Sequence, residues 1–241
     1  MRFALFSDIH GNLLALEAVL RDIDAAGADA HVCLGDLAAF GPRPAEVLDR
    51  LALVEDLLVI RGNTDRWLGA VRERPSGPFE ERILDRLKES LAWTLERLPD
   101  RTAASLPELP EKGSVEWDGA SLAVVHGSPG SDTRGIEQGE AEAGLAAYLD
   151  EVGKAGLAAG HTHRPFVREV GPRLVVNDGS IGLPYDGVAR PSWALVTLAR
   201  GRISAEIRRV EYDLEAVCRD VEAVAMPFGE TMITRIRQAR M

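Results

Sequence analysis

The sequence has few cysteines, few aromatic residues and no long hydrophobic run. Its 241 residues include only Cys33 and Cys218, which are too few and too far apart for a disulfide framework or a cysteine-ligated zinc site. This cysteine content is typical of a reducing compartment, so we expect a cytoplasmic protein. No apolar stretch approaches the roughly 18 residues of a membrane-spanning helix, and the N-terminal residues enter a strand pattern directly. We therefore expect neither a membrane partner nor a signal peptide.

An excess of positive charge is also absent. The chain carries 28 Lys and Arg against 38 Asp and Glu, a net charge of −10. Surfaces that follow a nucleic-acid backbone are usually basic, so we expect no general nucleic-acid binding. A phosphate-bearing ligand held by metal ions is still compatible with this charge. The hydrophobic content of 46% is typical of a globular protein that can bury a large core, and we predict a single domain over residues 1–241.

Residues 1–65 have the pattern of three strands separated by two helices. The first helix should begin after Asn12, a suitable N-cap, and end at Gly27. The second should begin near Pro44, because proline is tolerated in a first helical turn, and continue through Val47, Leu48 and Leu51. The strands are expected near residues 2–7, 30–34 and 57–60.

Polar side chains follow each of these three strands. The pairs are Asp8 with His10 and Asn63 with Asp65, and Asp36 stands alone after the middle strand. The carboxyl ends of neighbouring parallel strands meet at one edge of a sheet, where ligands bind in open α/β folds. We therefore expect these side chains to share one site.

Residues 66–112 interrupt the alternation and predict a helical insert. A loop is expected at Pro75-Ser76-Gly77-Pro78, and an amphipathic helix follows it. We interpret Trp67 and Trp93 as packing residues; the alternative is a cap that shapes access of a substrate. The apolar stripe of the helix comprises Leu84, Leu87, Leu91, Leu95 and Leu98.

The second half is richer in strands. Asp118-Gly119 predicts a hairpin turn. The arginines of the last helix, Arg235, Arg237 and Arg240, are interpreted as a solvated face. Helices are expected near 138–149, 213–225 and 229–239. Strands are expected near 115–117, 121–125, 156–159, 165–170, 173–177, 193–198 and 203–210.

Four of the five histidines directly follow predicted strands. They are His10, His126, His161 and His163, whereas His31 begins a strand and is interpreted as structural. Clusters of histidine and aspartate are typical of zinc, iron and manganese sites. Together with Asp8, Asp36 and Asn63, these four histidines predict a metal centre.

Seven donors exceed the needs of one ion, so we predict two ions that share Asp36. Two divalent ions about 3.5–4 Å apart can hold a hydroxide between them and bind a phosphoryl oxygen, which suits in-line attack on phosphorus. No serine or cysteine nucleophile is then required. We interpret Ser7 and Ser128 as hydroxyls that support the metal ligands, because no base is evidently paired with either.

The ordered motifs resemble the calcineurin-like metallophosphoesterase superfamily, and within it the small bacterial and archaeal phosphodiesterases. The resemblance spans residues 1 to about 180 and implies a two-sheet β-sandwich flanked by helices, with both metals at one edge. The motifs that carry it are Ser7-Asp8-Ile9-His10-Gly11-Asn12, Gly35-Asp36-Leu37, Arg61-Gly62-Asn63-Thr64-Asp65, His126-Gly127-Ser128-Pro129, Gly160-His161-Thr162-His163 and Asn177-Asp178-Gly179-Ser180.

The resemblance also implies a ligand set and a choice of metals. One ion would be held by Asp8, His10, Asp36 and His163, and the other by Asp36, Asn63, His126 and His161. Manganese is common in such relatives, and iron, zinc or nickel also occur. The general order of metal affinities does not identify the native ion.

Two positions depart from the family pattern. Thr64 stands where many members have a histidine that acts as general acid or phosphate contact. A threonine hydroxyl does not titrate near pH 7, so it cannot serve as a general acid there as an imidazole can. This favours phosphodiesters over monoesters. Asp65 is expected to orient a ligand or to cap the next helix. Asp178 stands where relatives often have proline, and we interpret it as a residue at the rim of the site, with tuning of the site as the alternative.

The sequence as a whole predicts a mixed α/β metal-dependent phosphodiesterase that acts on a small phosphate ester. Asp36, Asn63 and His126 are the expected catalytic residues, with Arg164 favoured over Arg134 as a contact for the substrate phosphate. The alternatives are a phosphomonoesterase or protein phosphatase, a dinucleoside polyphosphate hydrolase, and a non-catalytic scaffold. The presence of all seven expected ligands counts against the scaffold.

Overall fold

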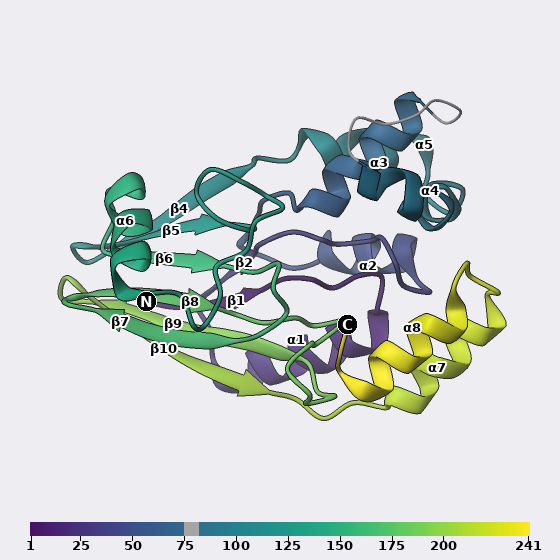
Figure 1. Ribbon diagram of the computed structural model, residues 1–241. Coiled ribbons are helices and arrows are strands. Elements are labelled where there is room, and N and C mark those ends of the chain that lie inside the picture. The colour runs from purple at the N-terminus through teal and green to yellow at the C-terminus, as the bar shows by residue number, and fades with distance from the viewer. Residues whose placement is uncertain (75–81) are drawn as a thin grey trace.

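A computed structural model describes residues 1–74 and 82–241, and these residues form two five-stranded sheets packed between two layers of helices (Figure 1). One sheet has the strand order β10-β9-β1-β2-β3 and the other has the order β4-β5-β6-β8-β7. The predicted two-sheet α/β architecture is confirmed. The loop predicted at Pro75-Ser76-Gly77-Pro78 lies outside the described residues.

The elements follow the predicted order along the chain. The first half contributes β1 (Arg2–Phe6), α1 (Leu13–Ala26), β2 (Ala30–Cys33), α2 (Pro44–Leu51), β3 (Leu57–Val59), α3 (Asn63–Glu73), α4 (Arg82–Leu95), α5 (Asp100–Ser105) and the 3-10 turn η1 (Leu106–Glu108). The second half contributes β4 (Lys112–Trp117), β5 (Ala120–Val125), α6 (Glu142–Val152), β6 (Gly156–Ala159), β7 (Phe166–Val170), β8 (Arg173–Asn177), β9 (Ser192–Ala199), β10 (Arg202–Arg209), α7 (Leu214–Ala223) and α8 (Gly229–Gln238).

The parallel strands bring the polar turns to one edge, as predicted. β1, β2 and β3 run parallel, with Phe6 opposite Cys33 and Cys33 opposite Val59. In the other sheet β5, β6 and β8 are parallel, and Ala159 lies opposite Asn177. Because all these strands point the same way, the residues that follow them gather where the edges of the two sheets meet.

Three apolar layers hold this arrangement together. Side chains of both sheets, among them Leu5, Val32 and Leu122, form the core between the sheets. The helices α1, α2 and α3 cover the outer face of the first sheet, where Trp67 is buried, and α6 covers the outer face of the second. Each sheet therefore has one face on the shared core and one face on helices, which is why its central strands are apolar throughout.

The termini of α1 are those predicted. The Asn12 side chain accepts a hydrogen bond from the Ala15 N–H at 3.1 Å, and Gly27 ends the helix in the left-handed conformation with φ 68°. The helix predicted at 138–149 is displaced and runs instead from Glu142 to Val152. Residues before it stay in a loop, because Arg168 donates hydrogen bonds to the backbone carbonyls of Gln138 and Glu140.

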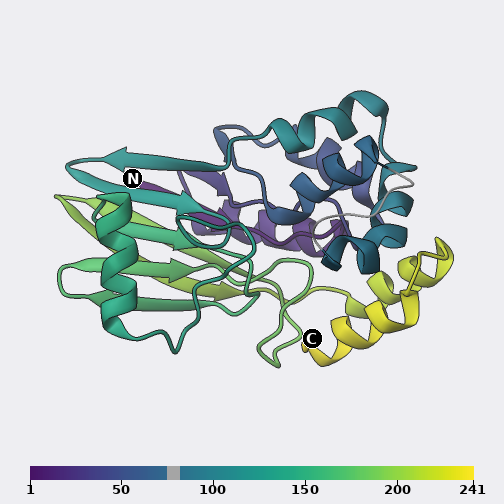
Figure 2. The same ribbon diagram turned by 45° about the horizontal axis from the view of Figure 1, so that its top comes forward.

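Two groups of helices stand on either side of the edge that carries the polar turns. Figure 2 shows the helices α3, α4 and α5 on one side and the C-terminal pair α7 and α8 on the other. Trp93 of α4 belongs to the same apolar cluster as Val221 of α7 and Met232 of α8, so one cluster joins the two groups. Both tryptophans are thus packing residues, as expected. Within the described part of the chain, no helix has the length and apolar character to cross a bilayer.

Candidate metal centre

The backbone of the polar turns is strained at the predicted ligands. Five of the seven have positive φ, a conformation that non-glycine residues adopt uncommonly. The φ values are 52° at Asp8, 47° at His10, 56° at Asp36, 65° at His161 and 57° at His163. Such strain persists only where the surrounding structure holds it, and it concentrates at functional sites. Backbone strain is therefore found at five of the seven positions that the sequence motifs predict as metal ligands.

Hydrogen bonds between the turns maintain this conformation. The Asp8 N–H donates to the Gly35 carbonyl and the His10 N–H donates to the Asp36 carbonyl, each at 3.0 Å. The Gly160 N–H donates to the His126 carbonyl at 2.8 Å, which couples two turns of the second sheet. These bonds run from one strand end to the next, so the two sheets together determine where the ligands lie.

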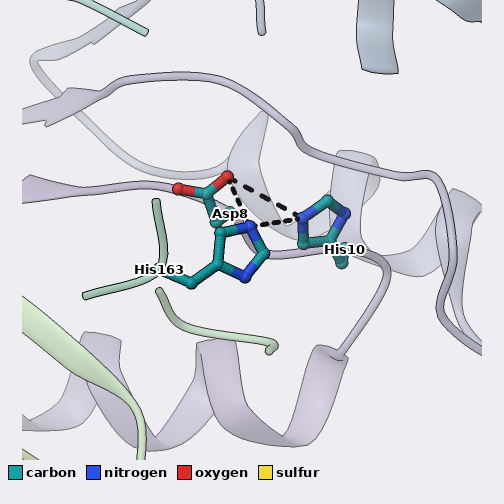
Figure 3. A group of neighbouring side chains, drawn as sticks. All are labelled: Asp8, His10 and His163. Carbon is teal, nitrogen blue, oxygen red and sulfur yellow. Dashed lines mark hydrogen bonds and ion pairs between the residues drawn. The ribbon is translucent and has the colours of Figure 1, made fainter. Parts of the chain in front are cut away.

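The first group of candidate ligands comprises Asp8, His10 and His163 (Figure 3). Asp8 Oδ1 lies 3.2 Å from His163 Nε2 and 3.7 Å from His10 Nε2, and the two Nε2 atoms are 3.3 Å apart. All three side chains are buried. Asp8 Oδ1 has no hydrogen-bond partner among the described residues, although its carboxyl is completely buried. A buried oxygen without a donor is a ready ligand for a cation.

The second group comprises Asn63, His126 and His161. The Asn63 amide oxygen lies 2.9 Å from both His126 Nε2 and His161 Nδ1, and these two nitrogens are 3.3 Å apart. Rotation of the amide would let its NH2 group donate to both rings instead. Two imidazoles and one amide thus converge on a single point, and a cation there would select the orientation that offers the amide oxygen.

Asp36 lies between the two groups. Its Oδ2 atom is 3.7 Å from His10 Nε2 and 3.6 Å from His126 Nε2. Its Oδ1 atom accepts a hydrogen bond from the Thr64 N–H at 2.9 Å. The backbone amide therefore fixes one oxygen, and the other is nearly equidistant from a histidine of each group, as a carboxylate shared by two ions would be.

Each of the four histidines is oriented by a backbone carbonyl. His10 Nδ1 lies 3.0 Å from the Ala39 carbonyl and His126 Nδ1 lies 2.8 Å from the Leu34 carbonyl. His163 Nδ1 faces the Leu183 carbonyl. His161 Nε2 lies 3.1 Å from the Thr133 carbonyl. A carbonyl only accepts, so each facing nitrogen must carry the proton. The remaining nitrogen of every ring then directs a lone pair into the centre, the arrangement usual for metal-ligating histidine.

The charges in the centre favour the forms that bind metals. Although burial raises it, the pKa of Asp8 is lowered by His163, with smaller effects of His126 and His10. Burial lowers the pKa of both His10 and His161, which keeps these imidazoles neutral. Burial also lowers the pKa of His126, but the Asp36 and Asp8 carboxylates outweigh it and raise that pKa. An ionised carboxylate beside the neutral imidazoles of His10 and His161 fits divalent cations, and a cation would compete with a proton for the His126 ring.

A second layer of polar groups supports the candidate ligands. The Ser7 hydroxyl donates to Asp8 Oδ2 at 2.7 Å. Asp65 accepts from the Gly62 N–H, where it caps α3, and from the Asp36 and Leu37 N–H groups. Burial and the Asp36 charge raise the pKa of Asp65 to about 7, while its N–H donors lower it. Asp65 thus performs both expected tasks, because it caps a helix and holds the Asp36 turn.

Asp178 is not the rim residue that its turn-like sequence indicated. Its carboxyl is fully buried, and neither oxygen has a hydrogen-bond partner among the described residues, since the nearby Ser7 hydroxyl donates to Asp8. Burial, reinforced by the Asp8 charge, raises its pKa well above the ordinary value, although Ser7 lowers it. The loop that follows β8 packs against β1, with the Ile181 N–H donating to the Ser7 carbonyl at 3.0 Å, and this packing buries the Asp178 side chain.

This burial predicts that Asp178→Asn stabilises the metal-free protein more as the pH rises. A carboxyl whose pKa is raised by folding contributes its stability below the unfolded pKa and loses it as the pH rises through the folded pKa. Asparagine has no such dependence. The difference in unfolding free energy between variant and wild type should grow by about 1.4 kcal/mol for each pH unit in this range. Urea denaturation at pH 5, 6 and 7 measures it; a constant difference would mean that Asp178 is ionised throughout.

A cavity of about 430 Å³ opens beside the metal centre. It is lined by His10, Asp36, Asn63, Thr64, His161 and His163 on one side. Arg164 also lines the cavity, as its expected contact with the substrate phosphate requires. Arg134 is instead largely exposed and pairs with Glu140 at 3.9 Å.

His31 is remote from the candidate ligands, and its Nδ1 donates to the Glu55 carbonyl at 3.0 Å.

Two residues of the cavity were missed by sequence reasoning. Arg235 lines the cavity with Tyr185, so it does not share the solvated face on which Arg237 pairs with Glu215. Tyr185 stacks on His163, with ring centroids 4.4 Å apart and planes inclined by 6°. No local motif marks either residue, because each reaches the site only through the packing of distant segments.

Comparison with known proteins gives relatives over the whole chain. A solved metallophosphoesterase from Sphaerobacter thermophilus is 27% identical, covers 99% of both chains and has a TM-score of 0.77. An uncharacterized protein of Methanocaldococcus jannaschii is 28% identical over 245 residues, 93% of each chain. The phosphodiesterase YfcE of Escherichia coli is 39% identical over 74 residues, which cover 27% of this chain and 40% of that protein.

The family model agrees with the motifs. The model for the calcineurin-like phosphoesterase superfamily domain matches residues 1–201, most of the chain. This range includes all seven candidate ligands and the cavity residues Thr64, Arg164 and Tyr185, whereas Arg235 lies beyond it. Shared motifs, fold and family model together show that the protein belongs to the calcineurin-like phosphoesterase superfamily.

Proposed function

We propose that this protein is a phosphodiesterase that depends on a pair of divalent metal ions. The observation that carries the proposal is the position of Asp36 Oδ2, 3.7 Å from a histidine of one ligand group and 3.6 Å from a histidine of the other. In this proposal Asp8, His10, Asp36 and His163 hold one ion, and Asp36, Asn63, His126 and His161 hold the other. The resemblance and the chemistry of the donors both support this division.

Two bound ions would supply an activated water at neutral pH and would neutralise charge on the phosphoryl oxygens. The side chains of the protein would orient the substrate beside these ions. Arg164 lines the cavity and can donate to a phosphate oxygen, and the Thr64 hydroxyl is buried in the cavity wall without a partner among the described residues. The backbone carbonyls that hold the histidines keep the centre preorganised, so little rearrangement is needed when a substrate binds.

Thr64 supports a preference for diesters. Its side chain is neutral, so it cannot balance the second negative charge of a monoester as a protonated imidazole at this position would. A diester carries only one charge at the reacting phosphate. With manganese-loaded protein we expect kcat/KM for bis-p-nitrophenyl phosphate to exceed that for p-nitrophenyl phosphate by about tenfold or more.

Thr64→His is the matched variant for this prediction. It restores the residue that many relatives carry and should move the ratio toward the monoester. The preference for diesters is wrong if the wild-type protein hydrolyses the monoester faster. A ratio that Thr64→His leaves unchanged would show that the preference arises elsewhere in the cavity.

We also propose that residues 1–241 form one domain in which the insert at 66–112 acts as a cap. Besides the candidate metal ligands, the cavity is lined by Leu87 of α4, Trp67 of α3 and Met232 of α8. A substrate would therefore enter between the insert and the C-terminal helices. A cavity of about 430 Å³ favours a small phosphate ester over a phosphoprotein.

The proposed native metal is manganese, with iron, zinc or nickel as the other candidates. Imidazole and carboxylate donors together suit all four, so metal availability would decide among them. We place the activity in the cytoplasm. Within the described chain both cysteines are buried and unpaired, in keeping with a reducing compartment.

A further inference from the structure

Two guanidinium groups line the cavity beside the metal centre. Arg164 follows the turn of His163, and Arg235 comes from α8, near the end of the chain. Tyr185 lies between them. The Arg164 Nε–H donates to the Tyr185 backbone carbonyl at 3.2 Å. Arg235 lines the same cavity beside Tyr185. Burial raises the pKa of the Tyr185 hydroxyl, and the neighbouring Arg235 charge offsets part of this rise.

Tyr185 connects these arginines to the metal centre. Its ring stacks on that of His163, and its N–H donates to the His163 carbonyl at 3.0 Å. The Arg235 guanidinium is therefore separated from a candidate metal ligand by one aromatic ring. A molecule whose phosphate lies at the histidines would extend across Tyr185 toward Arg235.

The positive charge of the two guanidinium groups is poorly neutralised by the protein. Among the described residues Arg235 forms no ion pair, and Arg164 has only Glu137 at 3.7 Å, where both side chains are about half exposed. Such an exposed pair is weak. By contrast Arg237, two residues further along α8, donates to Glu215 at 2.6 Å. In a chain with net charge −10, two guanidinium groups left available in the cavity need an explanation.

We propose that Arg235 forms a second anion-binding subsite, to which Arg164 contributes in addition to its proposed contact with the reacting phosphate. The substrate would then be a phosphate ester with a further negatively charged group on the part that is not attacked. This inference rests on the proposed function, which places the reacting phosphate at the histidines. Guanidinium groups bind phosphate and carboxylate through paired, charge-assisted hydrogen bonds, so they suit such a group better than a neutral one. In the proposed function the metal ions would bind the reacting phosphate, so another group must bind a second anion.

The remaining cavity residues indicate what joins the two anionic groups. Phe40 and Trp67 also line the cavity, and they offer apolar, aromatic surface. A volume of about 430 Å³ suits a small organic molecule rather than a polymer. Doubly phosphorylated nucleosides have this combination of a planar group and two separated charges, and they serve as probes.

The test compares binding of three nucleotides to manganese-loaded protein by titration calorimetry. The probes are AMP, ADP and adenosine 3′,5′-bisphosphate, of which the last two place a second phosphate at different separations from the first. We expect at least one of these two to bind about tenfold or more tightly than AMP. Arg235→Gln should remove most of this advantage and leave AMP binding nearly unchanged. Arg237→Gln, on the same helix, should keep it.

The alternative outcomes are distinct. The subsite is wrong if neither doubly phosphorylated probe binds better than AMP, or if the advantage survives in both Arg235→Gln and Arg164→Gln. Since helix α8 packs through Met232 and Ile236, urea denaturation of each variant separates loss of the guanidinium from loss of the fold. Failure of the proposed function would give a different result. The doubly phosphorylated probes would still bind more tightly than AMP, but the protein would hydrolyse no phosphodiester.

Discussion

Asp36→Asn should lower kcat/KM for phosphodiester hydrolysis by at least about 1,000-fold. Asp36 Oδ2 lies 3.7 Å from His10 Nε2 in one histidine group and 3.6 Å from His126 Nε2 in the other. The amide keeps the size of the side chain and can still accept from the Thr64 N–H, but it removes the charge that two cations would share. The metal content should accordingly fall from the proposed two ions per chain toward one or none.

The matched control is Asp150→Asn. Asp150 is exposed on α6, where it pairs with Arg173 at 2.6 Å, and its replacement should leave activity and metal content unchanged. Full activity in Asp36→Asn would remove the basis of the proposed two-metal centre. A wild-type protein that binds metal but hydrolyses no phosphate ester would instead favour a non-catalytic scaffold.

Gly35→Ala should destabilise the protein by about 3 kcal/mol or more. Gly35 has φ +97°, which L-residues rarely adopt, and a β-carbon there would lie 2.2 Å from the Gly62 nitrogen and 2.6 Å from the Arg61 carbonyl carbon. These are backbone atoms of the neighbouring turn, so they cannot move aside as a flexible side chain could. Because Asp36 follows directly, the metal centre should be lost with the local structure.

Denaturation in urea measures this effect, with Gly139→Ala as the control. Gly139 lies in the loop before α6, and a β-carbon there would meet no atom within 4 Å. Its replacement should change the unfolding free energy by less than about 0.5 kcal/mol. A loss below about 1 kcal/mol in Gly35→Ala would show that the turns after β2 and β3 can separate at little cost.

Most of the fold follows from local patterns. The N-cap at Asn12 and the left-handed glycine at Gly27 bound α1 as predicted, since a cap depends on residues within one turn of the helix. The apolar runs gave the strands, because a strand buried on both faces is apolar throughout. Residues 138–141 were wrongly included in a helix, because hydrogen bonds from Arg168 of β7 hold them in a loop.

The candidate ligands could also be found in the sequence, because each follows a strand and parallel strands bring their ends together. Asp178 and Arg235 could not. Asp178 has a turn-like sequence, but a loop packed on β1 buries it, and the last helix brings Arg235 to Tyr185 across 50 residues of chain. Amino-acid order alone determined most of the secondary structure, the parallel sheet edge and the seven candidate donors. Tertiary packing decided which charges became buried or were left available to a ligand, because desolvation and pairing depend on neighbours that are distant in the chain.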